Sequence, residues 1–221
     1  MVFAKIYDLS QPISQECPGW PEFKPTNILR EYNSAIHGFN AETVTMNTHT
    51  GTHLDAPFHF FNQGAKIDQL PLENFTGEAI FLDFRNVSKD TPITAEQLRA
   101  FSSFIHADDI VILVTGWSAK RAMQEEYIFQ WPYLDGSGAE FLLSRHIKGV
   151  GCDTLSLGGW GSPAKGRPCH EVILGARKFI VEELKVPDLL LDGQHHLFSC
   201  FPILLRDCGG SWTRAVVYEL K

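Results

Sequence analysis

One short segment, residues 47–60, restricts what this chain can be more than any other part of it. It holds four side chains suited to metal binding or proton transfer within eleven positions: His49, His53, Asp55 and His59. A neutral histidine offers a nitrogen ligand and an aspartate an anionic oxygen, a combination that suits Zn²⁺ and also Mn²⁺ or Fe²⁺. We therefore predict a metal site built around His49, His53 and Asp55, with His59 close by as a candidate proton carrier.

The spacing of these residues also restricts the local backbone. In a straight strand with ~3.4 Å per residue, His49 and Asp55 would lie ~20 Å apart, too far to share an ion. A helix would bring the histidines together, but Pro57 and the Thr-rich run around Gly51 disfavour one. Because glycine adopts backbone angles closed to other residues, we expect a strand that ends near His49, a tight bend at Gly51, and a turn or short helix opened by Pro57.

A chance cluster of partly buried histidines is the alternative explanation of the segment. For any single histidine that explanation would usually hold, but four such residues around a bend-permitting glycine favour a site. The spacing is not that of the HExxH metalloproteases, because residue 50 is a threonine and no glutamate lies between the histidines. Three ligands from one segment leave an ion open to water, which is the catalytic arrangement.

A second group of ligands can come from residues 169–171 and 180–183. Taken alone, both segments are weak indications, because their glutamates would more often be solvated and His170 would more often be a surface residue. Cys169 beside His170 also suggests a Cys–His nucleophile, but neighbours in sequence rarely point at each other, and we expect a buried thiol instead. The sequence contains no GxSxG elbow, GxGxxG motif or P-loop, so it indicates neither a serine hydrolase nor a nucleotide cofactor.

Length and composition are those of an ordinary globular protein. The 221 residues, 44% of them hydrophobic, suffice for one sizeable core and show no linker, so we expect a single domain over residues 1–221. A net charge of −7 without a basic cluster argues against nucleic acid as a partner. No apolar stretch is long enough for a signal peptide or a membrane span. The five cysteines are an odd number without CxxC spacing, which indicates reduced thiols in a cytoplasmic protein.

Hydrophobic patterning predicts a mixed α/β fold with more strand than helix. Runs rich in β-branched or aromatic residues between turn formers indicate strands at 6–9, 41–46, 79–84, 110–115, 149–152, 179–181 and 215–220. Helices are indicated at 94–101, 120–126 and 138–145.

Six segments of the chain match, in order, those of a known family. The metal segment HTGTHLDAPFHF (49–60) is the most specific of them. The others are YDLSQPI (7–13), DIVILVTGW (109–117), GVGCDTLS (149–156), CHEVIL (169–174) and the closing stretch from FPILL to TRA (201–215). Through these segments the chain resembles, over nearly its whole length, the cyclase family of metal-dependent hydrolases. That family includes bacterial kynurenine formamidases and isatin hydrolases.

The resemblance implies a swivelling β/β/α fold, in a protein that is usually dimeric or larger. It implies that His49, His53 and Asp55 bind one metal ion and that His59 acts as general acid/base. Asp55, His170 and Glu182 would bind a second ion where one is present.

Glu182 rather than Glu183 matches the family's glutamate. That residue follows two apolar residues and precedes one further residue and a leucine, as in the run IVEEL at 180–184.

The resemblance also points to Trp20, because formamidases place a tryptophan next to a proline in contact with the substrate. Two departures follow in this chain. Glu22 and Phe23 replace the Gly-Asp that continues the Trp-Pro pair in formamidases, and residues 157–160 lack the aspartate expected there. Both changes fall where the substrate would be recognised, while the metal ligands are unaffected.

The combined expectation is a metal-dependent, arylformamidase-like hydrolase that cleaves a small amide, formamide or lactam with one or two Zn²⁺ or Mn²⁺ ions. A substrate with an aromatic ring is expected, because Trp20 and the phenylalanines around His59 offer flat apolar surface. The alternative is a protein of the same fold that binds a metal or a small molecule without turnover. A closed structural site, however, would have no use for the additional His59.

Overall fold

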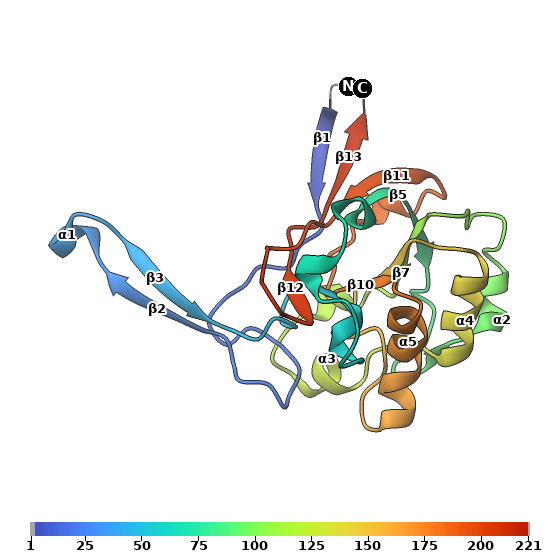
Figure 1. Ribbon diagram of the computed structural model, residues 1–221, viewed down its shortest axis with the longest axis horizontal. Coiled ribbons are helices and arrows are strands. Elements are labelled where there is room, and N and C mark those ends of the chain that lie inside the picture. The colour runs from blue at the N-terminus through green and yellow to red at the C-terminus, as the bar shows by residue number, and fades with distance from the viewer. Residues whose placement is uncertain (1–2, 221) are drawn as a thin grey trace.

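The computed structural model describes residues 3–220, and a nine-stranded sheet lies at its centre (Figure 1). Met1, Val2 and Lys221, which belong to the predicted 1–221 domain, lie outside the described residues. In order across the sheet, the strands are β1 (Phe3–Asp8), β13 (Val216–Leu220), β11 (His195–Ser199), β5 (Thr76–Asp83), β7 (Ile110–Val114), β9 (Gly149–Cys152), β10 (Phe179–Glu182), β4 (His53–Asp55) and β12 (Gly210–Trp212).

The middle of this sheet is parallel and its outer parts are antiparallel. Strands β5, β7, β9 and β10 run in one direction, and the remaining pairs in the sheet are antiparallel. The sequence of β7, IVILV, is buried throughout. A continuous apolar run of this kind is typical of a strand covered on both faces.

Two apolar clusters cover the two faces of the sheet. On one face, Ile80 and Val111 pack with residues of α2 (Ala95–Arg99), α4 (Gly136–Ser144) and α5 (Pro163–Gly175). On the other face, the strand residues adjacent in sequence to those of the first cluster pack with the 3₁₀ segment Leu72–Phe75 and with β11. The alternation follows from the two-residue period of a strand.

A third cluster, rich in aromatic residues, lies beside the carboxyl ends of the parallel strands. It contains Trp117, Tyr127 and Trp131, with Trp20 and Trp160 packed against it. The elements around it are the 3₁₀ segment Trp117–Lys120, α3 (Glu125–Phe129) and the two-stranded sheet of β6 (Pro92–Ile93) and β8 (Tyr133–Leu134). Further 3₁₀ turns are Pro57–His59, Ile67–Gln69 and Asp188–Leu190.

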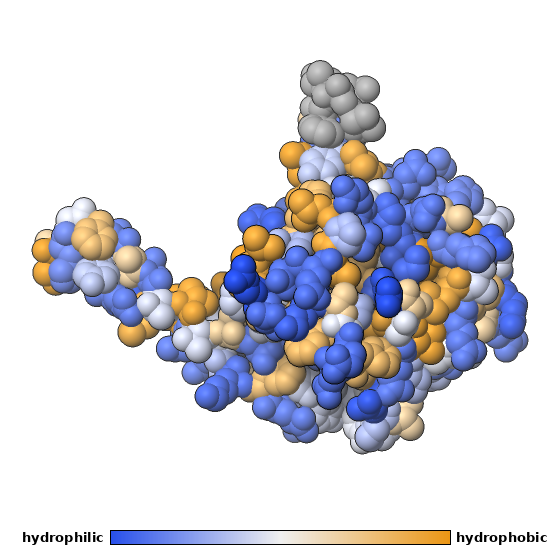
Figure 2. Space-filling view, in the orientation of Figure 1, coloured by the Kyte–Doolittle hydropathy of each residue, from blue (hydrophilic) through white to orange (hydrophobic). Residues whose placement is uncertain are grey.

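A hairpin of residues 27–45, which we call the arm, extends away from the body of the molecule (Figure 1). It consists of β2 (Asn27–Tyr32) and β3 (Ala41–Thr45), paired antiparallel, with the short helix α1 (Ser34–His37) at its tip. Figure 2 shows hydrophobic side chains on its surface. The exposed apolar residues of the arm are Leu29, Tyr32, Ile36, Phe39 and Val44, and Ile36 is 79% exposed.

The predicted mixed α/β fold is confirmed, as are strands in all seven predicted segments. The predicted helix at 120–126 is wrong, because a 3₁₀ turn ends at Lys120 and α3 begins only at Glu125. The sequence analysis missed α5, the arm strand β2 and the strands β4, β11 and β12. Short strands such as β4, which has three residues, leave too little pattern for recognition.

The five cysteines are free, in agreement with the predicted reduced thiols, and four of them are buried. Within residues 3–220, no helix has both the length and the apolar character needed to cross a membrane.

Candidate metal centre

The predicted bend in the metal segment lies at Gly51, whose φ is +71°. This left-handed backbone angle favours glycine, and a Cβ atom there would also require the flexible Ile13 side chain to move, since its Cδ1 would lie 2.2 Å away. Pro57 opens the 3₁₀ turn Pro57–His59, as predicted. The expected strand end near His49 is wrong: β3 ends at Thr45, and His49 lies in the turn that follows.

The three-residue strand β4 fixes the orientation of two ligand candidates. His53 and Asp55 project on the same face because they are two positions apart, while Leu54 packs into the apolar cluster on the opposite face. On the neighbouring strand β10, Glu182 lies directly across from His53. Helix α5 brings His170 to the same place. Glu182 is the last residue of a parallel strand, and ligands of α/β sheets bind beyond such carboxyl ends.

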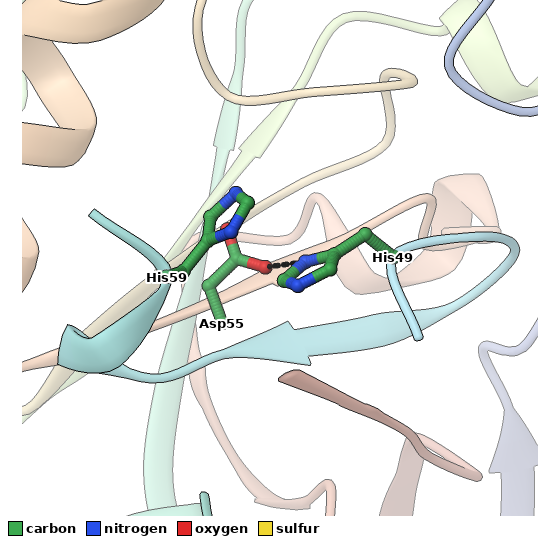
Figure 3. Close-up of side chains that lie close together, drawn as sticks. All are labelled: His49, Asp55 and His59. Carbon is green, nitrogen blue, oxygen red and sulfur yellow. Dashed lines mark hydrogen bonds and ion pairs between the residues drawn. The ribbon is translucent and has the colours of Figure 1, made fainter. Parts of the chain in front are cut away.

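Asp55 lies at the centre of the site, 1% exposed, with its carboxylate facing several histidines. His49 Nδ1 lies 2.7 Å from Asp55 Oδ1, and His53 Nε2 lies 3.5 Å from the same oxygen. His170 Nε2 lies 3.8 Å from Oδ2. Figure 3 shows His59 and His49 on either side of Asp55, and the rings of these two histidines stack with centroids 3.9 Å apart.

Glu182 is the second buried carboxylate of the site. Its Oε1 accepts a hydrogen bond from the Leu157 backbone N–H at 2.7 Å and one from Ser156 Oγ at 3.2 Å. His170 Nε2 is 3.2 Å from the same oxygen, and His53 Nε2 is 3.3 Å from Oε2. The carboxylate is thus held from one side by the loop after β9 and from the other by histidines.

Backbone carbonyls orient two of the histidines. His53 Nδ1 donates to Gly51 O at 2.7 Å, and His170 Nδ1 donates to Gly166 O at 2.8 Å. Each ring therefore presents Nε2 to the two carboxylates, which is how hydrogen bonds behind metal-binding histidines usually fix the ligand nitrogen.

The buried charges perturb one another strongly. Burial alone would raise the pKa of the Asp55 carboxyl, but the neighbouring His59 and His49 hold it well below its usual range. Burial and Asp55 would also raise the pKa of Glu182, yet the close imidazoles of His170 and His53 hold it at about 2. Two anionic carboxylates in contact inside the protein require compensating positive charge.

Burial lowers the pKa of His59 to about 4, and the adjacent His49 and His170 act in the same direction, against the attraction of Asp55. The pKa of His53 shifts in the opposite direction. Burial would lower the pKa of His53, but the carboxylates of Asp55 and Glu182 raise it well above its usual range.

The histidine nitrogens and carboxylate oxygens of this site are suitable ligands for a bound cation. Buried atoms Nε2 of His53 and Oδ2 of Asp55 have no hydrogen-bond partner among the described residues. Two groups whose ligand atoms all lie within 4.8 Å of one another share Asp55: His49, Asp55 and His59 form one group, and His53, Asp55 and Glu182 the other. A divalent ion would satisfy the unpaired atoms and balance the two carboxylates.

The structure brings together all six predicted metal and proton-transfer residues, from β4, the 3₁₀ turn Pro57–His59, α5, β10 and the turn that holds His49. Glu183, in contrast, turns away, and its carboxylate binds Arg121 Nε at 3.0 Å and Tyr127 Oη at 2.7 Å. His170 and both glutamates are buried, although each segment alone suggests an exposed position. Cys169 is buried as expected, yet its Sγ does lie 3.5 Å from His170 Nδ1, so the expectation that these neighbours would not meet is wrong.

A cavity of about 500 Å³ opens onto the site. His49, His59, His170 and Glu182 reach it, and its walls include Trp20, Phe23, Phe60, Trp160 and Arg167. Trp20 and Trp160 contact each other edge to face, with centroids 4.7 Å apart. Trp20 therefore lies where the sequence analysis expected it, and Glu22, Phe23 and Trp160, which belong to the two departures, are also in the cavity wall.

Sequence reasoning missed the contribution of Gly209 and Gly210. A Cβ on Gly210 would lie 2.5 Å from His49 Cε1, and a Cβ on Gly209 would lie 3.1 Å from the His59 backbone. The Gly-Gly pair at the start of β12 is the signal that was available, since glycine in a strand often marks close approach of another group. Phe60 is one of the phenylalanines around His59 from which the sequence predicts apolar surface; it lines the cavity, and its ring stacks on His170 at 4.7 Å.

Comparison with known proteins gives consistent matches. The profile of a family described as "Putative cyclase" matches residues 7–158. A kynurenine formamidase from Geobacillus thermodenitrificans is 31% identical over 214 residues, which cover 96% of this chain and 97% of that protein. A kynurenine formamidase from Bacillus cereus is 30% identical, over 95% of each chain.

Solved structures share the fold. Isatin hydrolase A from Labrenzia aggregata, bound to benzyl benzoate, superimposes with a TM-score of 0.88 at 22% identity, over 98% of this chain and 94% of that one. A structure described as a potential metal-dependent hydrolase with cyclase activity gives a TM-score of 0.80 at 25% identity, over 98% of both chains.

The close approach of β12 to His49 leads to a first prediction. In Gly210→Ala, the new methyl group would overlap His49 and the Leu54 carbonyl oxygen, so His49 must move. Displacements of ~1 Å in a catalytic site can cost ~10²-fold in rate, and we expect a loss of that order in kcat/KM together with weaker metal retention. The control is Gly175→Ala, whose Cβ would meet only the Phe61 ring at 3.4 Å. Equal activity of the two variants would contradict this account of Gly210.

Proposed function

Because this chain belongs to the cyclase family, we propose that it hydrolyses the C–N bond of a small aromatic amide, formamide or lactam. It is a metal-dependent amide hydrolase, like its relatives the kynurenine formamidases. One observation carries the proposal: two buried carboxylates, Asp55 and Glu182, face histidines at a cavity with aromatic walls.

The residues assigned to the ions are those that the family resemblance implies, and the geometry supports them. In this proposal His49, His53 and Asp55 hold one ion, and Asp55, His170 and Glu182 hold a second where it is present. The ions are Zn²⁺ or Mn²⁺, since nitrogen and carboxylate ligands suit both. Such an ion supplies an activated water at neutral pH and stabilises negative charge that develops on a carbonyl oxygen.

His59 is the residue that moves protons in this proposal. Its ring stacks on His49 and reaches the cavity, so a substrate amide and its attacking water would lie within reach. The imidazole takes a proton from the water and returns it to the leaving nitrogen. Asp55 and Glu182 remain ionised and keep the surrounding histidines in place.

The cavity walls support a flat aromatic substrate. Trp20, Phe60 and Trp160 give apolar surface on which a ring can pack, and Arg167 gives a positive charge in the wall. N-formylkynurenine is the substrate that the named relatives suggest, and Glu22 and Trp160 in the wall favour a similar ring compound over this one.

The arm supports a homo-oligomer, a dimer or larger, as the working form. Its exposed apolar side chains lie on a hairpin that extends into solvent, an arrangement that a second copy of the chain would cover. One domain over residues 1–221 and a cytoplasmic location complete the proposal, the latter supported by the free cysteines.

Chelation is the direct experiment on this function. Prolonged treatment with a strong chelator should abolish hydrolysis of an N-formyl aromatic amide, and Zn²⁺ or Mn²⁺ should restore it, because the proposed reaction needs an ion to activate the attacking water. Bound metal and initial rates are measured on the same samples. Full activity in protein shown to contain no metal would refute the proposal.

Replacing single histidines separates metal binding from proton transfer. His53→Ala should lose metal and activity together, whereas His59→Ala should retain metal and lose ~10²–10⁴-fold in kcat, the usual contribution of a general acid/base. His196→Ala, on strand β11 outside both the site and the arm, is the control and should change neither quantity. Loss of metal in His59→Ala would place His59 among the ligands, as its distance to Asp55 permits.

Trp20 is the residue with which to test the aromatic substrate. Trp20→Ala should raise KM for an aromatic formamide by up to ~10-fold, because a ring contact is worth ~0.5–1.5 kcal/mol. The KM for a small aliphatic formamide should hardly change. Trp20→Phe should bring the KM for the aromatic formamide most of the way back to the wild-type value. If KM rises equally for both substrates, Trp20 has only a structural role in the wall.

The arm proposal predicts a change of mass in solution. The wild-type protein should sediment at twice the mass of one chain or more, and the double variant Leu29→Glu/Ile36→Glu at that of one chain, because burying charge in an apolar interface is unfavourable. Leu72→Glu, exposed on the body, is the matched control and should leave the mass unchanged. A wild-type protein that sediments as a single chain would refute the proposal.

A further inference from the structure

A second cluster of metal-binding side chains lies away from the catalytic centre. His106 is in the loop after α2, Asp109 directly precedes β7, and His195 is the first residue of β11. The catalytic centre is at the carboxyl end of the parallel strand β10, whereas this cluster is at the amino end of β7, which runs in the same direction. None of the three residues lines the catalytic cavity.

The sheet places these residues on one face. His195 pairs with Ile80 of β5, which in turn pairs with Val111 of β7, and Ile80 and Val111 both pack on the helix-covered face. Asp109 is two positions before Val111, so its side chain is on that face as well. His195 can therefore reach across β5 to Asp109.

The carboxylate of Asp109 is buried and firmly held. It is 2% exposed, and its Oδ2 accepts the backbone N–H of His106 at 2.7 Å and lies 2.9 Å from His195 Nε2. The rings of His106 and His195 stack nearly parallel, at 11° and with centroids 4.5 Å apart. One ligand atom from each of the three residues lies within 4.8 Å of the others.

From this geometry we infer that His106, Asp109 and His195 form a further binding site for a divalent transition-metal ion of the Zn²⁺ type. Ligand atoms around a tetrahedral ion with bonds of ~2.0–2.1 Å are ~3.3 Å apart. The ligand atoms of the cluster are now up to 4.8 Å apart, and a rotamer change of the exposed His106 side chain can bring its ring nitrogen closer to the other two ligand atoms. Two imidazoles and a carboxylate are the ligands that such ions prefer, and the exposed side leaves room for water.

A purely structural role explains only part of the cluster. The bonds from the His106 backbone and from His195 to Asp109 fasten the start of β7 without any need for the His106 ring. Among residues 3–220, that ring has no hydrogen-bond or ion-pair partner, and its contact is the stack on His195. The metal site accounts for the position of the imidazole, and metal binding would replace the proton between His195 and Asp109.

Zinc stoichiometry of the whole protein tests this site. The protein is loaded with Zn²⁺, passed through a desalting column and titrated with further Zn²⁺ by calorimetry. The wild type should bind one more Zn²⁺ per chain than His106→Ala and His195→Ala, while hydrolysis by these variants stays as in the wild type. Because only the difference between proteins counts, a second ion that enters the catalytic centre cancels out.

The neighbouring His196 provides the matched control, since its Nε2 is 3.1 Å from Asp192 Oδ1 and not part of the cluster. His196→Ala should bind as many ions as the wild type. His106 is exposed, so His106→Ala keeps the proposal testable even if His195→Ala fails to fold, which its melting temperature reveals. Equal Zn²⁺ uptake by the wild type and His106→Ala would overturn the inference.

Discussion

Two ionised carboxylates buried side by side are the constraint on which the arrangement of this protein depends. Asp55 and Glu182 lie on adjacent strands, each almost fully removed from water. Leaving such charges unpaired in the interior costs several kcal/mol each, so the surrounding structure must supply cations, hydrogen-bond donors or both. Three histidines, one serine hydroxyl and one backbone N–H contribute to this requirement here, and Asp55 Oδ2 still has no hydrogen-bond partner among the described residues.

The residues around the two carboxylates lie on short elements that pack against the large sheet and its apolar clusters. Strand β4 has three residues, yet Leu54 anchors it in the apolar cluster while the residues on either side face the site. Helix α5 packs on the sheet through Cys169 and Ile173, which places His170 at the carboxylates. Gly210 lets β12 approach His49 closely. The positions of the side chains in the site are therefore set by packing contacts that extend well beyond the site.

The strands were predictable where a long apolar run made the pattern unambiguous, as in β5 and β7. Helix α5 was missed because Gly166 and Pro168 within it oppose helix formation by local preference, although Pro163 suits its first position. Its buried residues on the sheet offset that preference, and such tertiary packing has no local signature in the sequence. The helix predicted at 120–126 failed for the opposite reason. Its composition permits a helix, but the chain turns there in the folded protein.

The sequence alone determined the chemistry of this protein: the ligand types, the bend required at Gly51, and the resemblance of the metal segment to a family of hydrolases. These are local properties, since residue identity sets which atoms can bind a metal and spacing sets how the backbone must turn. The family resemblance already indicated Glu182, and the tertiary structure shows why Glu183 turns away, because strand register determines on which side a side chain lies. The tertiary structure alone decided that His106, Asp109 and His195 meet, because β11 and β7 both pair with β5, which brings together residues 86 positions apart in the sequence.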